Sequence, residues 1–146
     1  MNASTPQGKT FDKIDPASFL ADPELVRELR KHATPVPCHS DRVLFRQDDP
    51  SVGAYILYDG GVTLSLMAQD GRSLFAVQAS PGSVIGLPGA ISNKPYSLSA
   101  TALAGAQVSF ISREGLTNLM NSEPLLALKL LEVLAAEVRA ARKAIL

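Results

Sequence analysis

A β-hairpin between Val62 and Ala79 is the feature that most restricts how this chain can fold. Before Asp70-Gly71, a preferred two-residue hairpin turn, apolar residues alternate with polar ones. With Asp70 and Gly71 as the loop, every inward apolar residue meets another across the hairpin. The expected pairs are Gln69 with Arg72, Leu66 with Phe75, Leu64 with Val77, and Val62 with Ala79. This agreement predicts the register and a sheet with one face in the core.

Other short strands, separated by turn signals, surround this hairpin. The sequence predicts them at residues 42–45, 54–58, 97–103 and 107–111, the last two as a pair around Ala104-Gly105. A β-bulge in residues 97–103 would exchange Leu98 with Ser99 on the inner face, so the sequence leaves open which of them points inward. Strands this short and this closely spaced indicate an all-β roll or barrel over about residues 34–111.

The N-terminal part predicts a short helical arm. Asp15-Pro16 and Asp22-Pro23 each place a capping Asp before a Pro that suits the first helical position. Residues 1–14 are polar and contain Gly, Pro and Ser, so we expect a disordered lead-in there. A single domain is then expected over residues 15–146.

The last third of the chain predicts two helices. Ser112 suits the N-cap of a helix over residues 113–120, and a second helix is expected over about residues 123–146. This long helix carries an apolar stripe of Leu126, Leu130 and Val133 and, on an adjoining face, a heptad seam of Leu131, Leu134, Val138, Ala141 and Ile145. Two apolar faces need two partners. We expect the roll to cover one face and the same helix of a second copy to cover the seam; the alternative is that the chain's own arm covers it.

Composition argues against several classes of function. Lys plus Arg and Asp plus Glu both total 14, so no net charge attracts nucleic acid or anionic lipid. Cys38 is the only cysteine, and His32 and His39 are the only histidines, which is too few for the metal cluster of a cupin-type enzyme. There is also no Walker loop and no Ser-His-Asp order. We therefore expect no enzyme activity, no metal and no cofactor.

The sequence also predicts the cellular location. Its first residues lack the apolar core of a signal peptide. No run of about 18 uncharged apolar residues could span a membrane. We expect a cytoplasmic protein without membrane contact.

A Gly-rich loop spans residues 79–102. The order of helical arm, β-roll, Gly-rich loop, short helix and long apolar helix resembles the cyclic nucleotide-binding domain. More narrowly, it resembles the sensor half of catabolite-activator-type and Fnr-type (Crp/Fnr) transcription regulators. The matching motifs are Leu44-Phe45-Arg46-Gln47, residues 55–62, Asp70-Gly71, residues 81–86, Ser99-Ala100 and Pro124-Leu125-Leu126. The resemblance implies a mainly β fold with flanking helices: a double-stranded β-helix, or jelly-roll-like β-roll, with a long C-terminal dimerisation helix.

The Gly-rich loop lies where this family binds its ligand. There, amides of the short helix hold a cyclic phosphate, a Glu after the glycine binds the ribose, and an Arg before a Ser-Ala pair neutralises the phosphate. Gly86 occupies the glycine position, but Leu87 replaces the Glu, Leu98 replaces the Arg, and Pro88 removes one amide donor. We predict a degenerate phosphate-binding loop without useful affinity for cyclic AMP or cyclic GMP. The expected residues of this loop site are Gly86, Leu87, Gly89, Ser97, Leu98 and Ser99. Tyr96 lies nearby in the sequence, and we expect Leu87 and Leu98 to form an apolar roof over the site.

The sequence leaves two functions open. One is a sensor for a less charged small-molecule effector, which needs a cavity beneath residues 86–99; the other is an interaction or dimerisation module, in which Leu87 and Leu98 fill that space. The regulators that this chain resembles continue into a helix-turn-helix unit, whereas this sequence stops at Leu146, so we expect no direct nucleic-acid binding by it. We interpret the charged residues near the end as solvated helix positions: Glu132, Glu137, Arg139, Arg142 and Lys143.

Overall fold

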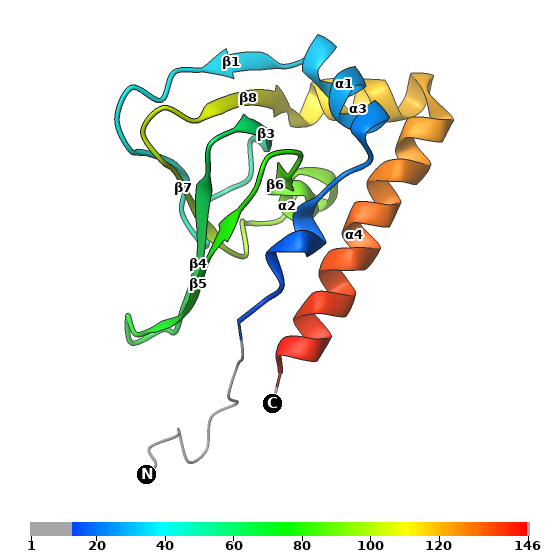
Figure 1. The fold of residues 1–146 in the computed structure, drawn as a ribbon. Helices are drawn as coiled ribbons and strands as arrows, with labels where there is room; N and C mark the ends of the chain where they lie inside the picture. The colour runs from blue at the N-terminus through cyan, green and yellow to red at the C-terminus, as the bar shows by residue number, and fades with distance from the viewer. Residues whose placement is uncertain (1–12, 146) are drawn as a thin grey trace.

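Two antiparallel sheets form a β-roll, and helices from both ends of the chain pack against it (Figure 1). This computed structural model describes residues 13–145. One sheet has the strand order β1-β8-β3-β6 and the other β2-β7-β4-β5. The strands are β1 Thr34–Val36, β2 Arg42–Phe45, β3 Gly53–Asp59, β4 Val62–Met67, β5 Ser73–Ala79, β6 Val84–Ile85, β7 Ser99–Ala102 and β8 Gln107–Ser112. The expected jelly-roll-like fold with flanking helices is confirmed.

The hairpin β4-β5 has the predicted register along its length but a different tip. Val62 pairs with Ala79, Leu64 with Val77 and Leu66 with Phe75. At the tip, Ala68 N–H donates to the Arg72 carbonyl over 2.8 Å and Gly71 N–H donates to the Ala68 carbonyl over 2.9 Å. The loop therefore has three residues rather than two, with Gly71 at a positive φ of 86°. A bulge between Leu66 and Met67 shifts the pairing by one residue towards the tip, where Ala68 rather than Gln69 lies opposite Arg72. The predicted pair of Gln69 with Arg72 is therefore wrong.

The predicted pairing of residues 97–103 with 107–111 is wrong. Strand β7 pairs with β2 and β4, whereas β8 pairs with β1 and β3, so these strands belong to different sheets. The turn between them crosses from one sheet to the other: Gly105 N–H donates to the Cys38 carbonyl over 2.8 Å, and Ala104 N–H donates to Asp41 over 2.8 Å. Both contacts anchor the turn to the segment that connects β1 with β2.

Three helices begin where their capping residues predict. The helices are η1 Pro16–Phe19, α1 Pro23–Lys31, α2 Leu87–Ser92, α3 Arg113–Ser122 and α4 Pro124–Ala144. Asp15, Asp22 and Ser112 each accept a backbone N–H with a side-chain oxygen at the start of η1, α1 and α3. Helix α4 ends at Ala144, earlier than expected, because Ile145 has extended backbone angles.

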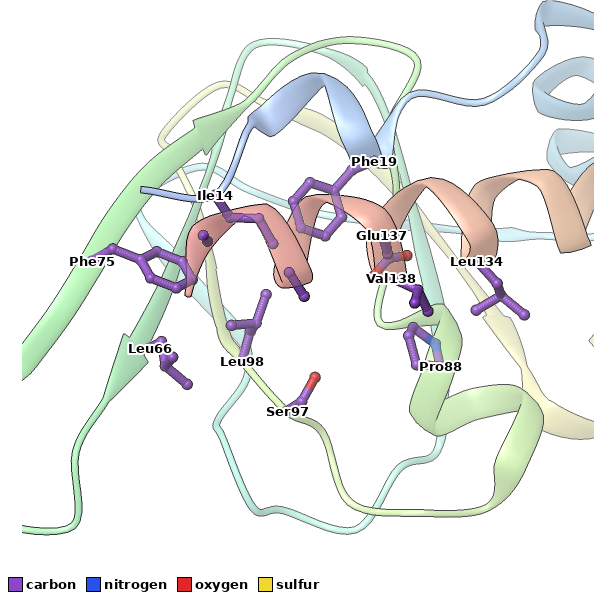
Figure 2. A pocket seen from close by; sticks show the side chains of 12 residues that line it. Ile14, Phe19, Leu66, Phe75, Pro88, Ser97, Leu98, Leu134, Glu137 and Val138 are labelled. Atoms are coloured by element: carbon purple, nitrogen blue, oxygen red, sulfur yellow. The ribbon is translucent and has the colours of Figure 1, made fainter. Parts of the chain in front are cut away.

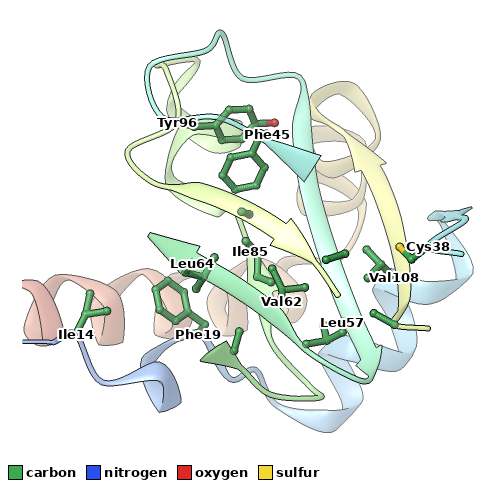
Figure 3. Packing of buried hydrophobic residues seen from close by; sticks show 14 of the residues in the cluster. Ile14, Phe19, Cys38, Phe45, Leu57, Val62, Leu64, Ile85, Tyr96 and Val108 are labelled. Atoms are coloured by element: carbon green, nitrogen blue, oxygen red, sulfur yellow. The ribbon is translucent and has the colours of Figure 1, made fainter. Parts of the chain in front are cut away.

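Strand β3 separates two hydrophobic cores. Leu57 faces the core between the two sheets, while Ile56 faces a second core formed with α1, α2, α3 and α4. Figure 3 shows the first core, in which Phe19 packs with Leu64. The predicted stripe of Leu126, Leu130 and Val133 on α4 is buried in the second core, as expected. Helix α4 and η1 thus lie along one side of the roll (Figure 1).

Two predictions concern the ends of the chain. The expected lead-in of residues 1–14 falls, except for Lys13 and Ile14, outside the described residues, and Ile14 itself is buried in the first core. The division into a lead-in and a domain over 15–146 stays a prediction. Among the helices of residues 13–145, none is long and apolar enough to cross a membrane.

Candidate functional site

Gly86 sits where β6 turns into α2, at the position predicted for the phosphate-binding turn. Its φ is +80°, in the left-handed region that favours glycine. A Cβ at this position would lie 3.0 Å from Tyr96 Cε1 and 3.2 Å from Phe45 Cε2. Gly86 is therefore required by both its backbone angle and the aromatic rings packed against it.

An aromatic pair occupies the space beneath this turn. The rings of Phe45 and Tyr96 stack with 3.9 Å between centroids and 14° between planes (Figure 3). The buried Tyr96 hydroxyl donates to the Gly53 carbonyl over 2.8 Å and also accepts backbone N–H groups of Val52 and Gly53. The cavity left under Gly86 has a volume of about 10 Å³. That is about the space for one water molecule. The stacked rings therefore fill most of the space beneath the turn.

Leu87 and Leu98, which stand where the resemblance implies a Glu and an Arg, point in different directions. Leu87 is fully buried in the second core, away from the cavities of the loop, so it forms no part of the expected roof. Leu98, by contrast, lines the small cavity under Gly86 and also a larger cavity against α4. The alternation of β7, with Ala100 buried, puts Leu98 inward and Ser99 outward, and Ser99 Oγ accepts the Gln47 N–H over 2.9 Å. Leu98, rather than Ser99, therefore faces the inside of the roll.

A larger cavity of about 320 Å³ lies between the tip of the roll and α4 (Figure 2). Its walls come from the hairpin β4-β5, the loop after α2, η1 and α4, and they are mostly apolar. The lining residues are Ile14, Phe19, Leu66, Phe75, Pro88, Ser97, Leu98, Leu134, Glu137, Val138, Ala141 and Ala144. Of the predicted ligand residues, Ser97 and Leu98 line this cavity, Gly86 and Gly89 line only the smaller one, and Leu87 and Ser99 line neither. Three of the predicted dimer residues, Leu134, Val138 and Ala141, also line it.

Glu137 is the functional candidate that the sequence interpretation missed. Its Oε2 atom is buried and has no hydrogen-bond partner within the described part of the chain. Burial raises the pKa of this carboxyl from its ordinary 4.5 to about 8, so at neutral pH it is mostly protonated. The interpretation of Glu137 as a solvated position is therefore wrong.

The helical pattern contained the signal that identifies Glu137. Continuing the buried stripe of Leu130 and Val133 by alternating steps of four and three reaches Glu137, Ala140 and Ala144. Glu137 is thus a charged residue type on the inward face of α4. Burying a charged carboxylate at such a position destabilises the fold unless a ligand pairs with it or the group is protonated and neutral.

The site has no positive charge for an anion. Among the described residues that line the two cavities there is no Lys, Arg, His or Asp. Lys94, the only basic residue of the Gly-rich loop, is exposed and lines neither cavity. The arrangement can enclose an apolar molecule and offer it one carboxyl group.

Gly86→Ala tests the packing of the aromatic pair against the turn. An Ala forced into the left-handed region costs about 1–2 kcal/mol, and the close ring contacts add about 1 kcal/mol or more. Gly71→Ala is the matched control, because Gly71 also has positive φ but nothing lies within 4 Å of its added Cβ. We expect urea unfolding to show a larger loss of stability for Gly86→Ala than for Gly71→Ala. Equal losses would show that the rings do not constrain Gly86.

Comparison with known proteins agrees with the fold. Residues 35–123 match the cyclic nucleotide-binding domain family. The catabolite activator protein of Thermus thermophilus is 25% identical with a TM-score of 0.70, and the match covers 88% of this chain and 60% of that one. The N-terminal domain of a transcriptional regulator from Streptomyces coelicolor is 26% identical with a TM-score of 0.63, covering 89% of this chain and 91% of that one.

A third similar structure is a cyclic nucleotide-binding-like protein from Brucella abortus, 27% identical with a TM-score of 0.54, covering 68% of this chain and 85% of that one. Among curated proteins no significant match is found. The chain spans only about 60% of the length of the Thermus protein. The resemblance to Crp/Fnr-type sensor domains is confirmed.

Proposed function

Because this chain belongs to the cyclic nucleotide-binding domain family, we propose that it is a non-enzymatic effector-sensing and dimerisation domain of a Crp/Fnr-type regulator. The proposed effector is a small molecule other than cyclic AMP or cyclic GMP bound by the usual contacts. One observation carries the proposal: the apolar cavity of about 320 Å³ against α4, beside a phosphate turn whose own cavity is about 10 Å³. A cavity of the larger size is in the range of small-molecule sites.

A thermal-shift screen with a metabolite library tests the sensing function. A ligand that binds the folded state raises the melting temperature by mass action. We expect at least one library compound to do so, and this increase should diminish when Leu98 in the cavity wall is changed to Phe. The second candidate function is an interaction module without an effector, and the stacked rings of Phe45 and Tyr96 under the turn favour it. A screen in which no compound raises the melting temperature would support that module instead.

The proposed dimer interface is the seam on α4. The N-terminal arm packs on α4, and Lys129 on α4 forms an ion pair with Asp22 at the start of α1, 3.0 Å apart. Despite this cover, Leu131 and Val138 are 53% and 50% exposed. A second copy packed through Leu131, Leu134, Val138, Ala141 and Ile145 would bury them, with Ile145 acting from beyond the end of the helix.

Leu131→Glu is expected to convert the dimer into a monomer. The substitution places a charge in the seam, where burial without a partner costs several kcal/mol. Because Leu131 is already half exposed in the single chain, the fold of each copy should be retained. Light scattering after size-exclusion chromatography measures the mass, and circular dichroism checks the fold. Glu132→Gln, at the neighbouring exposed position, is the control that should stay dimeric. A Leu131→Glu protein that stays dimeric would exclude this seam.

We also propose that this chain is located in the cytoplasm, has no enzyme activity and does not bind nucleic acid directly. Metal analysis of the purified protein and an electrophoretic mobility assay with DNA would test the last two.

A further inference from the structure

The cavity against α4 combines an apolar wall with one acid that lacks a partner. Phe19, Leu66, Phe75 and Leu98 supply much of the wall. Glu137 lines both this cavity and the smaller one under Gly86. Figure 2 shows the Glu137 side chain among the residues around the cavity, with Leu98 and Val138. Its buried Oε2 makes no hydrogen bond within residues 13–145.

No other charged group in the described structure faces Glu137 in this cavity. The neighbouring cations of α4, Arg139 and Lys143, line a separate groove with Lys13 and Asp15. Within residues 13–145, Tyr96 is the only other titratable group lining either cavity, and its hydroxyl is hydrogen-bonded to Gly53. Among residues 13–145, no cation lines the cavity beside this acid, and burial is the cause of its raised pKa.

We propose that this cavity binds a small apolar amine, whose ammonium group pairs with Glu137 while its hydrocarbon part lies against the apolar wall. This inference rests on the proposed function, since it names the ligand class of the same cavity. A cation restores the partner that the carboxylate lacks, and a charge-assisted hydrogen bond in a site with little water is stronger than a neutral one. An anion would lie unpaired beside an acid.

The proposal predicts a defined pH dependence of binding. An alkylammonium ion remains charged well above pH 8, as the Lys side chain does. Glu137 must lose its proton to pair with it, and its pKa in the free protein is about 8. Affinity for an amine should therefore rise by about tenfold per pH unit up to pH 8 and then level off. At pH 7, binding should release close to one proton.

Calorimetric titration of the 146-residue chain with octylamine, 1-octanol and octanoate tests the inference. At pH 8 we expect octylamine to bind at least tenfold more tightly than octanol, and octanoate to give no saturable heat. Glu137→Gln should reduce the affinity for octylamine to that for octanol, and Glu132→Gln, on the exposed side of α4, should leave it unchanged. Titration at pH 7 in buffers of different ionisation enthalpy measures the released proton.

The outcomes separate this inference from the proposed function. If octylamine and octanol bind equally, or if Glu137→Gln keeps the preference for the amine, the cavity remains a ligand site but the role of Glu137 is overturned. If octanoate binds as tightly as octylamine, the ligand class is wrong. If none of the three binds and the metabolite screen is also negative, the sensing function fails together with the inference.

Discussion

Glu137→Gln is expected to stabilise the protein at pH 8 by about 3–5 kcal/mol, at about 1.4 kcal/mol per unit of pKa shift. Burial raises the pKa of Glu137 from 4.5 to about 8. Between these values the unfolded chain loses a proton that the folded protein retains. The contribution of Glu137 to the free energy of unfolding is therefore fully present below about pH 4.5 and is lost as the pH rises through 8. Glutamine does not titrate, so the variant avoids this loss.

Urea unfolding at pH 4.5, 6 and 8 measures the effect. The difference between Glu137→Gln and the original protein should be small at pH 4.5 and should grow with each step. Glu132→Gln on the same helix is exposed and should follow the original protein at every pH. If all three proteins show parallel pH dependence, Glu137 is solvated in solution and the description of the cavity is wrong.

Local patterns predicted much of this fold. The alternation of Val62, Leu64 and Leu66 with polar residues was sufficient to give the hairpin register, because a slip by one residue would expose the whole apolar face. The helix starts followed from Asp15, Asp22 and Ser112, whose side chains satisfy backbone groups only a few residues away. In both cases the interacting groups are close in sequence or joined by one turn.

What the sequence did not predict depends on contacts between distant segments. Strands β7 and β8 are neighbours in the chain, but each finds its partners in a different sheet, and no local signal at Ala104-Gly105 distinguishes a hairpin from a crossing. The stack of Phe45 on Tyr96 joins β2 to the loop after α2. Only the folded structure shows that this stack lies under Gly86 and fills the space beneath the turn.

The candidate site was predicted in part. From Leu87 and Leu98, which stand where the resemblance implies a Glu and an Arg, the sequence predicted that an anion site is lost. It could not show that Leu87 turns into the helical core and that, of the two, Leu98 reaches the cavity. The helical pattern of α4 could have identified Glu137 as an inward-facing residue. The prediction failed because nearby Arg and Lys residues suggested a solvated face, whereas the phase of the buried stripe places Glu137 inward.

The other large expected effect is a loss of affinity for cyclic AMP and cyclic GMP. Leu98 lines the cavities where the resemblance implies an Arg, so we expect one charge-assisted contact to be missing there, worth about 1.5–3 kcal/mol. That loss alone corresponds to roughly ten- to hundred-fold in affinity, whereas Leu87 points away into the second core. The structure adds two obstacles: the cavity under Gly86 has about 10 Å³, and Glu137 lies at its edge. A cyclic phosphate there would have to displace the Phe45–Tyr96 stack and would remain without a cation.

Calorimetric titration of the purified protein with cyclic AMP and cyclic GMP at pH 7 tests cyclic nucleotide binding. We propose that the site is an apolar cavity with one acid rather than an anion-binding turn. We therefore expect no saturable heat for either nucleotide up to millimolar concentration. A stoichiometric transition with a low-micromolar dissociation constant for either nucleotide would contradict it.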